Sequence, residues 1–143
     1  MGQRRKAREL AAQTLYALSF REFNPEYIEH EMLNVYPEIL EELAEVDGLA
    51  SYSEVFAFAN DLVMNYIIHQ KDIEKEIEKH SENWTISRMS TMDRSILYIA
   101  VYELMFTDTP PPVIINEALE IAKRFCGTGT GKFMPFKISS INV

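Results

Sequence analysis

The segment that decides the fold spans residues 90–125 and reads STMDRSILYIAVYELMFTDTPPPVIINEALEIAKRF. Between positions 96 and 106, every residue is apolar or aromatic except Glu103. On a helix these side chains point in all directions, which is typical of a helix buried among other elements. The run is too short to span a membrane, which takes roughly 20 residues, and too long for a buried strand of about 4–8 residues. We therefore predict a central buried helix at about 90–107, with the rest of the chain packed around it.

Capping residues and prolines set the boundaries of this helix and the next. Ser90 and Asp93 have the spacing of a capping box at the start of the central helix. Consecutive prolines at 110–112 end that helix, and the last of them suits the first turn of a second helix at about 112–125. The residues of the central helix that we expect to be almost completely buried are Ile96, Ile99, Ala100 and Leu104.

The remaining chain also shows helical patterns, so the predicted fold class is all-α. Apolar side chains recur at helical spacing, and pairs such as Asn24 and Pro25 have the form of a helix start. Further helices are predicted at about 4–20, 25–34, 37–47, 53–70 and 71–80.

Charge is distributed unevenly along the chain. The net charge is −8, yet residues 1–21 hold five Lys or Arg and one acid, whereas residues 22–70 hold eleven acids and no Lys or Arg. A compact basic end beside an acidic body can still bind a phosphate backbone locally. The basic cluster comprises Arg4, Arg5, Lys6 and Arg8. From composition alone, this cluster is either a solvated N-terminus or an RNA-backbone site.

Other site classes find little support in the sequence. A lone cysteine, Cys126, excludes an internal disulfide and a cysteine-rich metal site. His30, His69 and His80 lack partners at metal-ligand spacing, so we expect no metal site. The N-terminus has no apolar segment of the signal-peptide kind, and nothing spans a membrane. We therefore expect a cytoplasmic protein.

Four segments together resemble the NusB family of transcription antitermination factors. They are RRKARELAAQTLY at 4–16, DRSILYIAVYEL at 93–104, INEALEIAKRF at 115–125 and GKF at 131–133. The resemblance implies a compact helical bundle of two packed halves, about 1–70 and 71–133, in a single domain over residues 1–143. It also implies that the basic cluster, Arg4, Arg5, Lys6 and Arg8, binds RNA.

The tail MPFKISSINV at 134–143 departs from the family pattern. Family members continue with an Asn-Gly pair and a last helix. That final helix is therefore missing or altered here, and we expect the apolar surface it would cover to favour homo-oligomers.

The glycine-rich segment CGTGTGKF at 126–133 is not a phosphate-binding P-loop. That motif needs a glycine where Cys126 stands, and a serine or threonine where Phe133 stands. The resemblance implies instead a loop in which Lys132 and Phe133 contact RNA, the aromatic ring being able to stack on a base. The positions where the family usually carries acidic residues hold Thr128, Gly129 and Thr130.

Two aromatic residues lie off the expected core face of the first helix. Tyr16 and Phe20 are four residues apart, on the side that also carries Arg5, Glu9 and Ala12. Either another helix covers them, or they form a contact surface for a partner, where aromatic residues are enriched. The resemblance implies that Tyr16 and Asp93 face a partner protein.

The resemblance further implies a non-enzymatic RNA-binding adaptor without a cofactor. Such an adaptor pairs with the ribosomal protein NusE, binds single-stranded boxA RNA and joins the RNA polymerase antitermination complex, notably on rRNA operons. Two alternatives stay open: the RNA-recognition NusB-like domain of an rRNA methyltransferase, and a helical interaction scaffold that binds no RNA. For the first of these, we find neither a cofactor-binding glycine motif nor enough chain for a catalytic domain.

Overall fold

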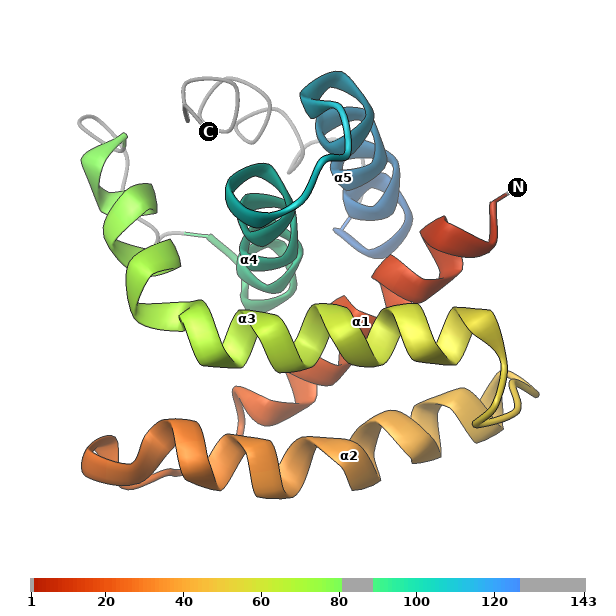
Figure 1. Ribbon diagram of the computed structural model, residues 1–143, viewed down its shortest axis with the longest axis horizontal. Coiled ribbons are helices and arrows are strands. Elements are labelled where there is room, and N and C mark those ends of the chain that lie inside the picture. Colours follow the sequence, from red (N-terminus) through yellow and green to blue (C-terminus); the bar gives the residue numbers. More distant parts are fainter. Residues whose placement is uncertain (1, 81–88, 127–143) are drawn as a thin grey trace. The chain divides into compact units, whose positions relative to one another are not determined.

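The computed structural model describes residues 2–80 and 89–126, and every regular element in these ranges is helical (Figure 1). The all-α prediction is thus confirmed. The elements are α1 (Gln3–Leu18), the 3-10 turn η1 (Pro25–Tyr27), α2 (Ile28–Val46), α3 (Glu54–Lys79), α4 (Thr91–Phe106) and α5 (Pro111–Cys126).

Two predicted helix breaks are wrong. The segments expected at 25–34 and 37–47 form η1 and the single helix α2, which continues through Pro37. A proline removes one backbone hydrogen bond from a helix interior, but Pro37 is exposed while its neighbours Tyr36, Ile39 and Leu40 are buried. Burial of this apolar face outweighs the lost bond.

The segments expected at 53–70 and 71–80 are likewise one helix, α3. The change from apolar to charged composition after residue 70 therefore marks a change in exposure and not a break. Ile73 and Ile77 remain buried at 0% and 3% exposure, as predicted for the inward face of this charged segment.

The chain divides into two compact units, Met1–Ile68 and His69–Val143. In the first unit α1 packs against α2. The core contains Leu10, Leu18, Leu40 and Leu62, each at most 1% exposed. A hydrogen bond from the Tyr36 hydroxyl to Asn60 Oδ1, 2.8 Å long, also joins α2 to α3.

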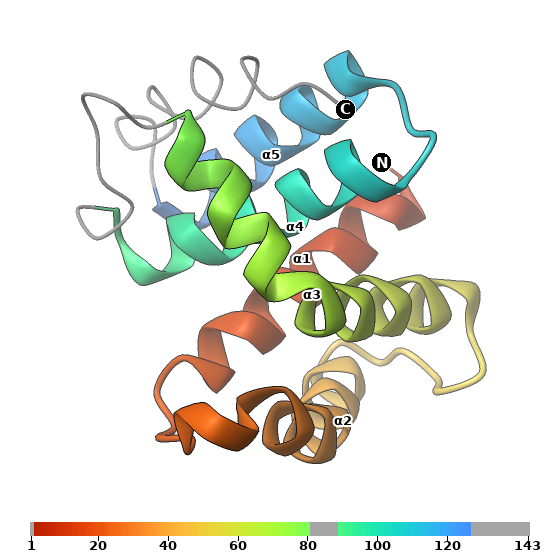
Figure 2. The same cartoon turned by 60° about the vertical axis from the view of Figure 1, so that its left-hand side comes forward.

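In the second unit α4 packs against α5 (Figure 2). The backbone N–H of Asp93 donates to Ser90 Oγ at 3.1 Å, so the predicted serine cap is present. The residues predicted to be buried in α4, namely Ile96, Ile99, Ala100 and Leu104, are 2–3% exposed. The α5 residues that complete this core are Ile114, Ala118, Ile121 and Ala122.

Residues 134–143 lie outside the described ranges, and so do Lys132 and Phe133. The altered final helix and the single domain over residues 1–143 therefore stay predictions. Among the described helices, none combines the length and the apolar composition that a membrane span requires.

Candidate nucleic-acid interface

The first turn of α1 carries positive charge from two sources. Its N-cap residue, Gly2, has no side chain to cap the helix, and the first turn contains no acidic residue. The unsatisfied N–H groups at a helix start act as a partial positive charge. Arg4, Arg5 and Lys6 add full charges directly beside them. This end of α1 is therefore suited to bind an anionic group.

The four predicted RNA-binding residues of α1 differ strongly in exposure. Arg4 is exposed, Arg5 and Lys6 are half-buried, and Arg8 is only 5% exposed. The guanidinium carbons of Arg4 and Arg8 lie 4.7 Å and 5.5 Å from the centroid of the Phe58 ring, which comes from α3. Both distances are within the range of cation–π attraction. The Phe58 ring thus restrains the guanidinium groups of two of the four cations, Arg4 and Arg8.

Lys6 is engaged in ion pairs within the first unit. Its Nζ lies 2.7 Å from Asp47 Oδ2, at the end of α2, and 3.9 Å from Glu9 Oε1. Asp47 lies in the acidic stretch 22–70 and Glu9 lies on α1 itself, and both carboxylates neutralise part of the basic cluster. Of the four basic residues, Arg4 is the most exposed to solvent.

The aromatic pair expected on the first helix is present at the surface, although α1 ends at Leu18 and Phe20 lies two residues beyond it. The Tyr16 and Phe20 side chains are 37% and 67% exposed, and their rings meet edge to face with centroids 4.9 Å apart. Among the described residues no helix buries them. However, Glu9 and Ala12, which were expected on the same outward side of α1, are buried at 4% and 1% exposure. The outward face of α1 is thus narrower than predicted.

Asp93, the second residue expected to face a partner, is only 4% exposed and belongs to the second unit. Within the described part of the chain, its Oδ1 atom is buried and has no hydrogen-bond partner. Burying a carboxylate oxygen without a donor is costly. Its place in the first turn of α4 offsets part of this cost, because a helix start favours negative charge.

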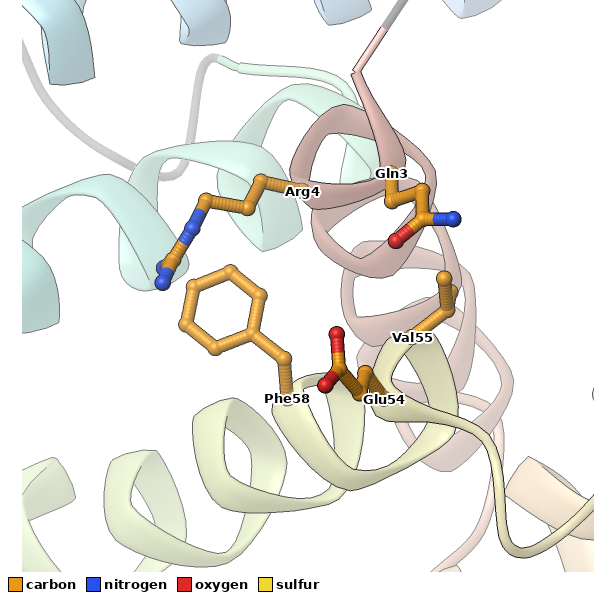
Figure 3. A pocket seen from close by; sticks show the side chains of 5 residues that line it. All are labelled: Gln3, Arg4, Glu54, Val55 and Phe58. Atoms are coloured by element: carbon orange, nitrogen blue, oxygen red, sulfur yellow. The ribbon is translucent and has the colours of Figure 1, made fainter.

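A small cleft beside Arg4 was not anticipated from the sequence. Its volume is about 130 Å³, and five residues of α1 and α3 line it: Gln3, Arg4, Glu54, Val55 and Phe58 (Figure 3). Sequence reasoning missed it because the two groups of residues are distant in the chain. A weak signal existed in Phe58, an aromatic residue within the helix predicted at 53–70.

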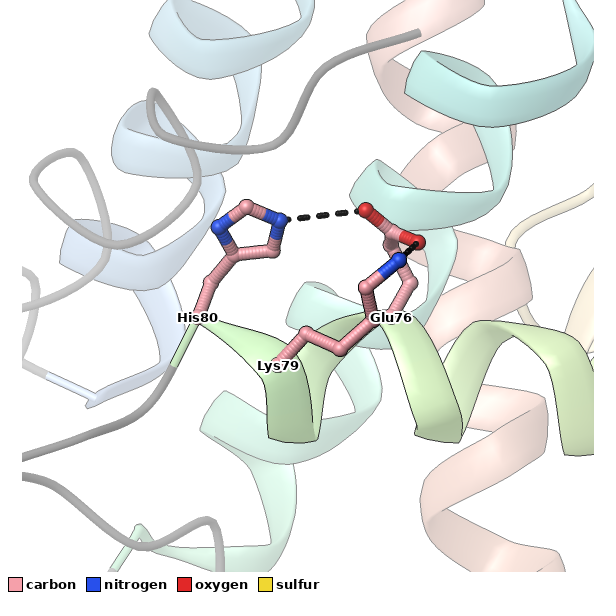
Figure 4. Close-up of polar contacts among 3 residues, drawn as sticks. All are labelled: Glu76, Lys79 and His80. Carbon is pink, nitrogen blue, oxygen red and sulfur yellow. Dashed lines mark hydrogen bonds and ion pairs between the residues drawn. The ribbon is translucent and has the colours of Figure 1, made fainter.

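The end of α3 holds a separate polar cluster. Glu76 accepts from Lys79 Nζ at 3.5 Å and pairs with His80 Nε2 at 3.1 Å (Figure 4). Cations near a helix C-terminus interact favourably with its partial negative charge, so this cluster has a structural explanation. Over residues 2–80 and 89–126, no group of three His, Cys, Asp or Glu side chains could hold a metal ion.

Fold and surface together define an all-helical protein whose first helix offers a basic end and an exposed aromatic pair. The NusB family profile matches residues 5–134. The chain belongs to the NusB family.

Similar proteins agree with this assignment. The chain is 35% identical to the transcription antitermination protein NusB of Elusimicrobium minutum, covering 94% of this chain and 89% of the relative. It is 41% identical to the NusB protein of Geobacter sulfurreducens, covering 87% and 83%. A crystal structure of the antitermination factors NusB and NusE in complex with dsRNA superposes with a TM-score of 0.79 and 25% identity, covering 97% of this chain and 95% of that one.

Proposed function

We propose that this chain is a transcription antitermination factor. It pairs with the ribosomal protein NusE, binds boxA RNA, and suppresses termination by RNA polymerase, notably on rRNA operons. The observation that carries this proposal is the family match over residues 5–134, which includes the basic helix α1 from Arg5 onward. Support also comes from a related NusB protein that was crystallised with NusE and dsRNA.

In this proposal the basic end of α1 binds the RNA backbone. Arg4 is exposed and reaches phosphates directly, aided by the uncapped start of the helix. Arg5, Lys6 and Arg8 add to the local positive potential, and Arg8 does so beside the Phe58 ring. Lys132 and Phe133 contribute a further backbone contact and a stacking surface.

The partner surface in this proposal is centred on Tyr16. An exposed aromatic pair is a typical anchor for a protein partner, because large rings bury much apolar area with little loss of rotamer freedom. Phe20 extends the same surface and contacts the Tyr16 ring. Asp93 contributes its negative charge at the start of α4.

The proposed adaptor works without catalysis, cofactor or membrane, in the cytoplasm, where nascent RNA and RNA polymerase meet. The methyltransferase alternative is not favoured, because the NusB proteins of Elusimicrobium minutum and Geobacter sulfurreducens are matched over 89% and 83% of their own length. Self-association through the apolar surface that the family's last helix would cover remains part of the proposal.

A titration with three components tests this function. The chain, a NusE protein and labelled boxA-like RNA are mixed, and the pairwise and ternary affinities are measured. We expect RNA to bind weakly to the chain alone and more tightly with NusE present. Because coupling is reciprocal, RNA should tighten the protein pair by the same factor, on the order of 1–3 kcal/mol. The proposal is wrong if neither NusE nor RNA binds, or if the two bind without coupling.

A quadruple variant separates RNA binding from partner binding. Replacing Arg4, Arg5, Lys6 and Arg8 with alanine should weaken binding to all single-stranded RNAs and flatten its salt dependence by roughly 0.7 per lost phosphate contact. Affinity for NusE in the absence of RNA should change little. Unchanged RNA affinity at about 50 mM salt would remove the basis for assigning RNA binding to this end of α1.

A further inference from the structure

The cleft between α1 and α3 is open on one side and large enough to receive the six-membered ring of a planar ligand, while the rest of the ligand extends outward. Its volume is about 130 Å³, and an apolar cavity of about 150 Å³ in another protein accommodates benzene. Val55 is buried and Phe58 half-buried, so one side of the cleft is apolar. Figure 3 shows the five lining side chains grouped around this space, with the Glu54 carboxylate directed into it. The cleft can therefore accept a flat ring.

The polar groups of the cleft are available to a ligand. Within the described part of the chain, Gln3 and Glu54 make no hydrogen bond or ion pair, and Arg4 contacts only the Phe58 ring. Arg4 and Glu54 carry opposite charges and line one small cleft, yet they are not within ion-pair distance of each other. A ligand that meets both must offer acceptors to the guanidinium and donors to the carboxylate.

Guanine is the nucleobase that offers both donors for the carboxylate and acceptors for the guanidinium. Its N1–H and N2–H groups can donate to the two oxygens of a carboxylate, and its O6 and N7 atoms accept from an arginine. Adenine has no donor at N1. Cytosine and uracil do not present adjacent donors that match a carboxylate together with an O6/N7 acceptor pair. Phe58 adds an apolar contact to the base, while its ring also carries the Arg4 guanidinium.

We propose that this cleft binds an unpaired guanine of the RNA, with Glu54 as the residue that selects the base. The inference rests on the proposed function and adds a specificity determinant to it. The position of the cleft favours a base within a strand over a free nucleotide. The uncapped, basic start of α1 borders the cleft and can hold the adjoining phosphate.

Replacing Glu54 with glutamine should lower the affinity for a guanine-containing RNA and leave unchanged or raise the affinity for an adenine-containing RNA. Affinities are measured at about 50 mM salt for two single-stranded oligonucleotides that differ only in one central guanine or adenine. For the unchanged chain, we expect the guanine oligonucleotide to bind about five- to a hundred-fold more tightly. In E54Q this preference should fall to near unity. The adenine oligonucleotide should bind E54Q as tightly or more tightly, because one negative charge is gone.

The controls separate base selection from electrostatics. Glu42→Gln removes the same charge from an exposed position of α2 that does not line the cleft, and it should leave the guanine preference intact. Inosine in place of guanine should lower the affinity for the unchanged chain but not for E54Q, because inosine lacks the N2 amino group. Guanosine monophosphate alone should compete weakly; competition as strong as that of the oligonucleotide would mean that the cleft binds free nucleotides.

Failure of this inference is distinguishable from failure of the proposed function. If both oligonucleotides bind the unchanged chain equally, or if E54Q keeps the preference, the guanine site is refuted while RNA binding stands. If neither oligonucleotide binds, the proposed RNA-binding function falls and the guanine site falls with it. Circular dichroism of E54Q should match that of the unchanged chain, since Glu54 is exposed.

Discussion

The ion pair between Lys6 and Asp47 predicts a substitution that strengthens RNA binding. Lys6 Nζ and Asp47 Oδ2 lie 2.7 Å apart, with the two side chains 32% and 30% exposed. Asp47→Asn removes the nearer of the two carboxylates and leaves only Glu9 Oε1 at 3.9 Å, so Lys6 can turn to a phosphate. A partly exposed pair of this kind contributes at most about 1 kcal/mol to stability. The variant should therefore remain folded.

The size of the effect follows from counterion release. One additional phosphate contact steepens the dependence of log affinity on log salt by about 0.7 for single-stranded RNA. Between about 50 and 200 mM salt, the Asp47→Asn variant should then lose about threefold more affinity than the unchanged chain. At the low-salt end it should bind any single-stranded RNA more tightly, without a change in base preference.

Fluorescence titrations with a labelled oligonucleotide at several salt concentrations measure this slope. Asp61→Asn is the matched control, because it makes the same chemical change at an exposed position of α3 that forms no ion pair with any residue the structure describes. The reasoning is refuted if Asp47→Asn leaves the slope unchanged. It is equally refuted if Asp61→Asn steepens the slope by the same amount.

Three further predictions concern stability and partner binding. Leu104→Ala should lower the free energy of unfolding by about 2–5 kcal/mol in chemical denaturation, because Leu104 is 3% exposed in the core of the second unit; a tolerated Leu104→Asp would contradict this packing. Burial, and then repulsion from Glu78, raises the pKa of Glu74, so its charged form opposes folding. Glu74→Gln should therefore stabilise the chain near neutral pH, and the gain should vanish as the pH falls below about 4, the ordinary pKa of glutamate; a gain that persists in acid would point to another cause. Tyr16→Ala should weaken NusE binding by about 2 kcal/mol in calorimetry while RNA binding to the chain alone stays the same, and equal affinity for NusE would place the partner elsewhere.

The helices were predictable because helical periodicity is a local property of the chain. The unbroken apolar run at 96–106 identified α4, and the prolines at 110–112 located the start of α5. The breaks expected near Pro37 and after residue 70 were wrong. Local signals of this kind show where a helix is weakened, but burial of its apolar face decides whether it continues.

The candidate site was predictable only in part. The sequence located the basic cluster at 4–8 and the aromatic pair Tyr16 and Phe20, since both are contiguous or separated by one helical turn, but it left open whether another helix covers the pair. It could not show that Arg8 is buried or that Phe58 lies beside two of the arginines. Those facts depend on which residues of α3 approach α1.

By itself, then, the sequence determined the helical class, the buried central helix and the positive charge of the first helix. Only the tertiary structure decided which of those charges face solvent. Lys6 is paired with Asp47 and Arg4 shares a cleft with Glu54, although the members of each pair are far apart in the chain. Electrostatic interactions depend on distance in space and on local burial. Composition sets the number of charges, and packing sets how many of them remain available to a ligand.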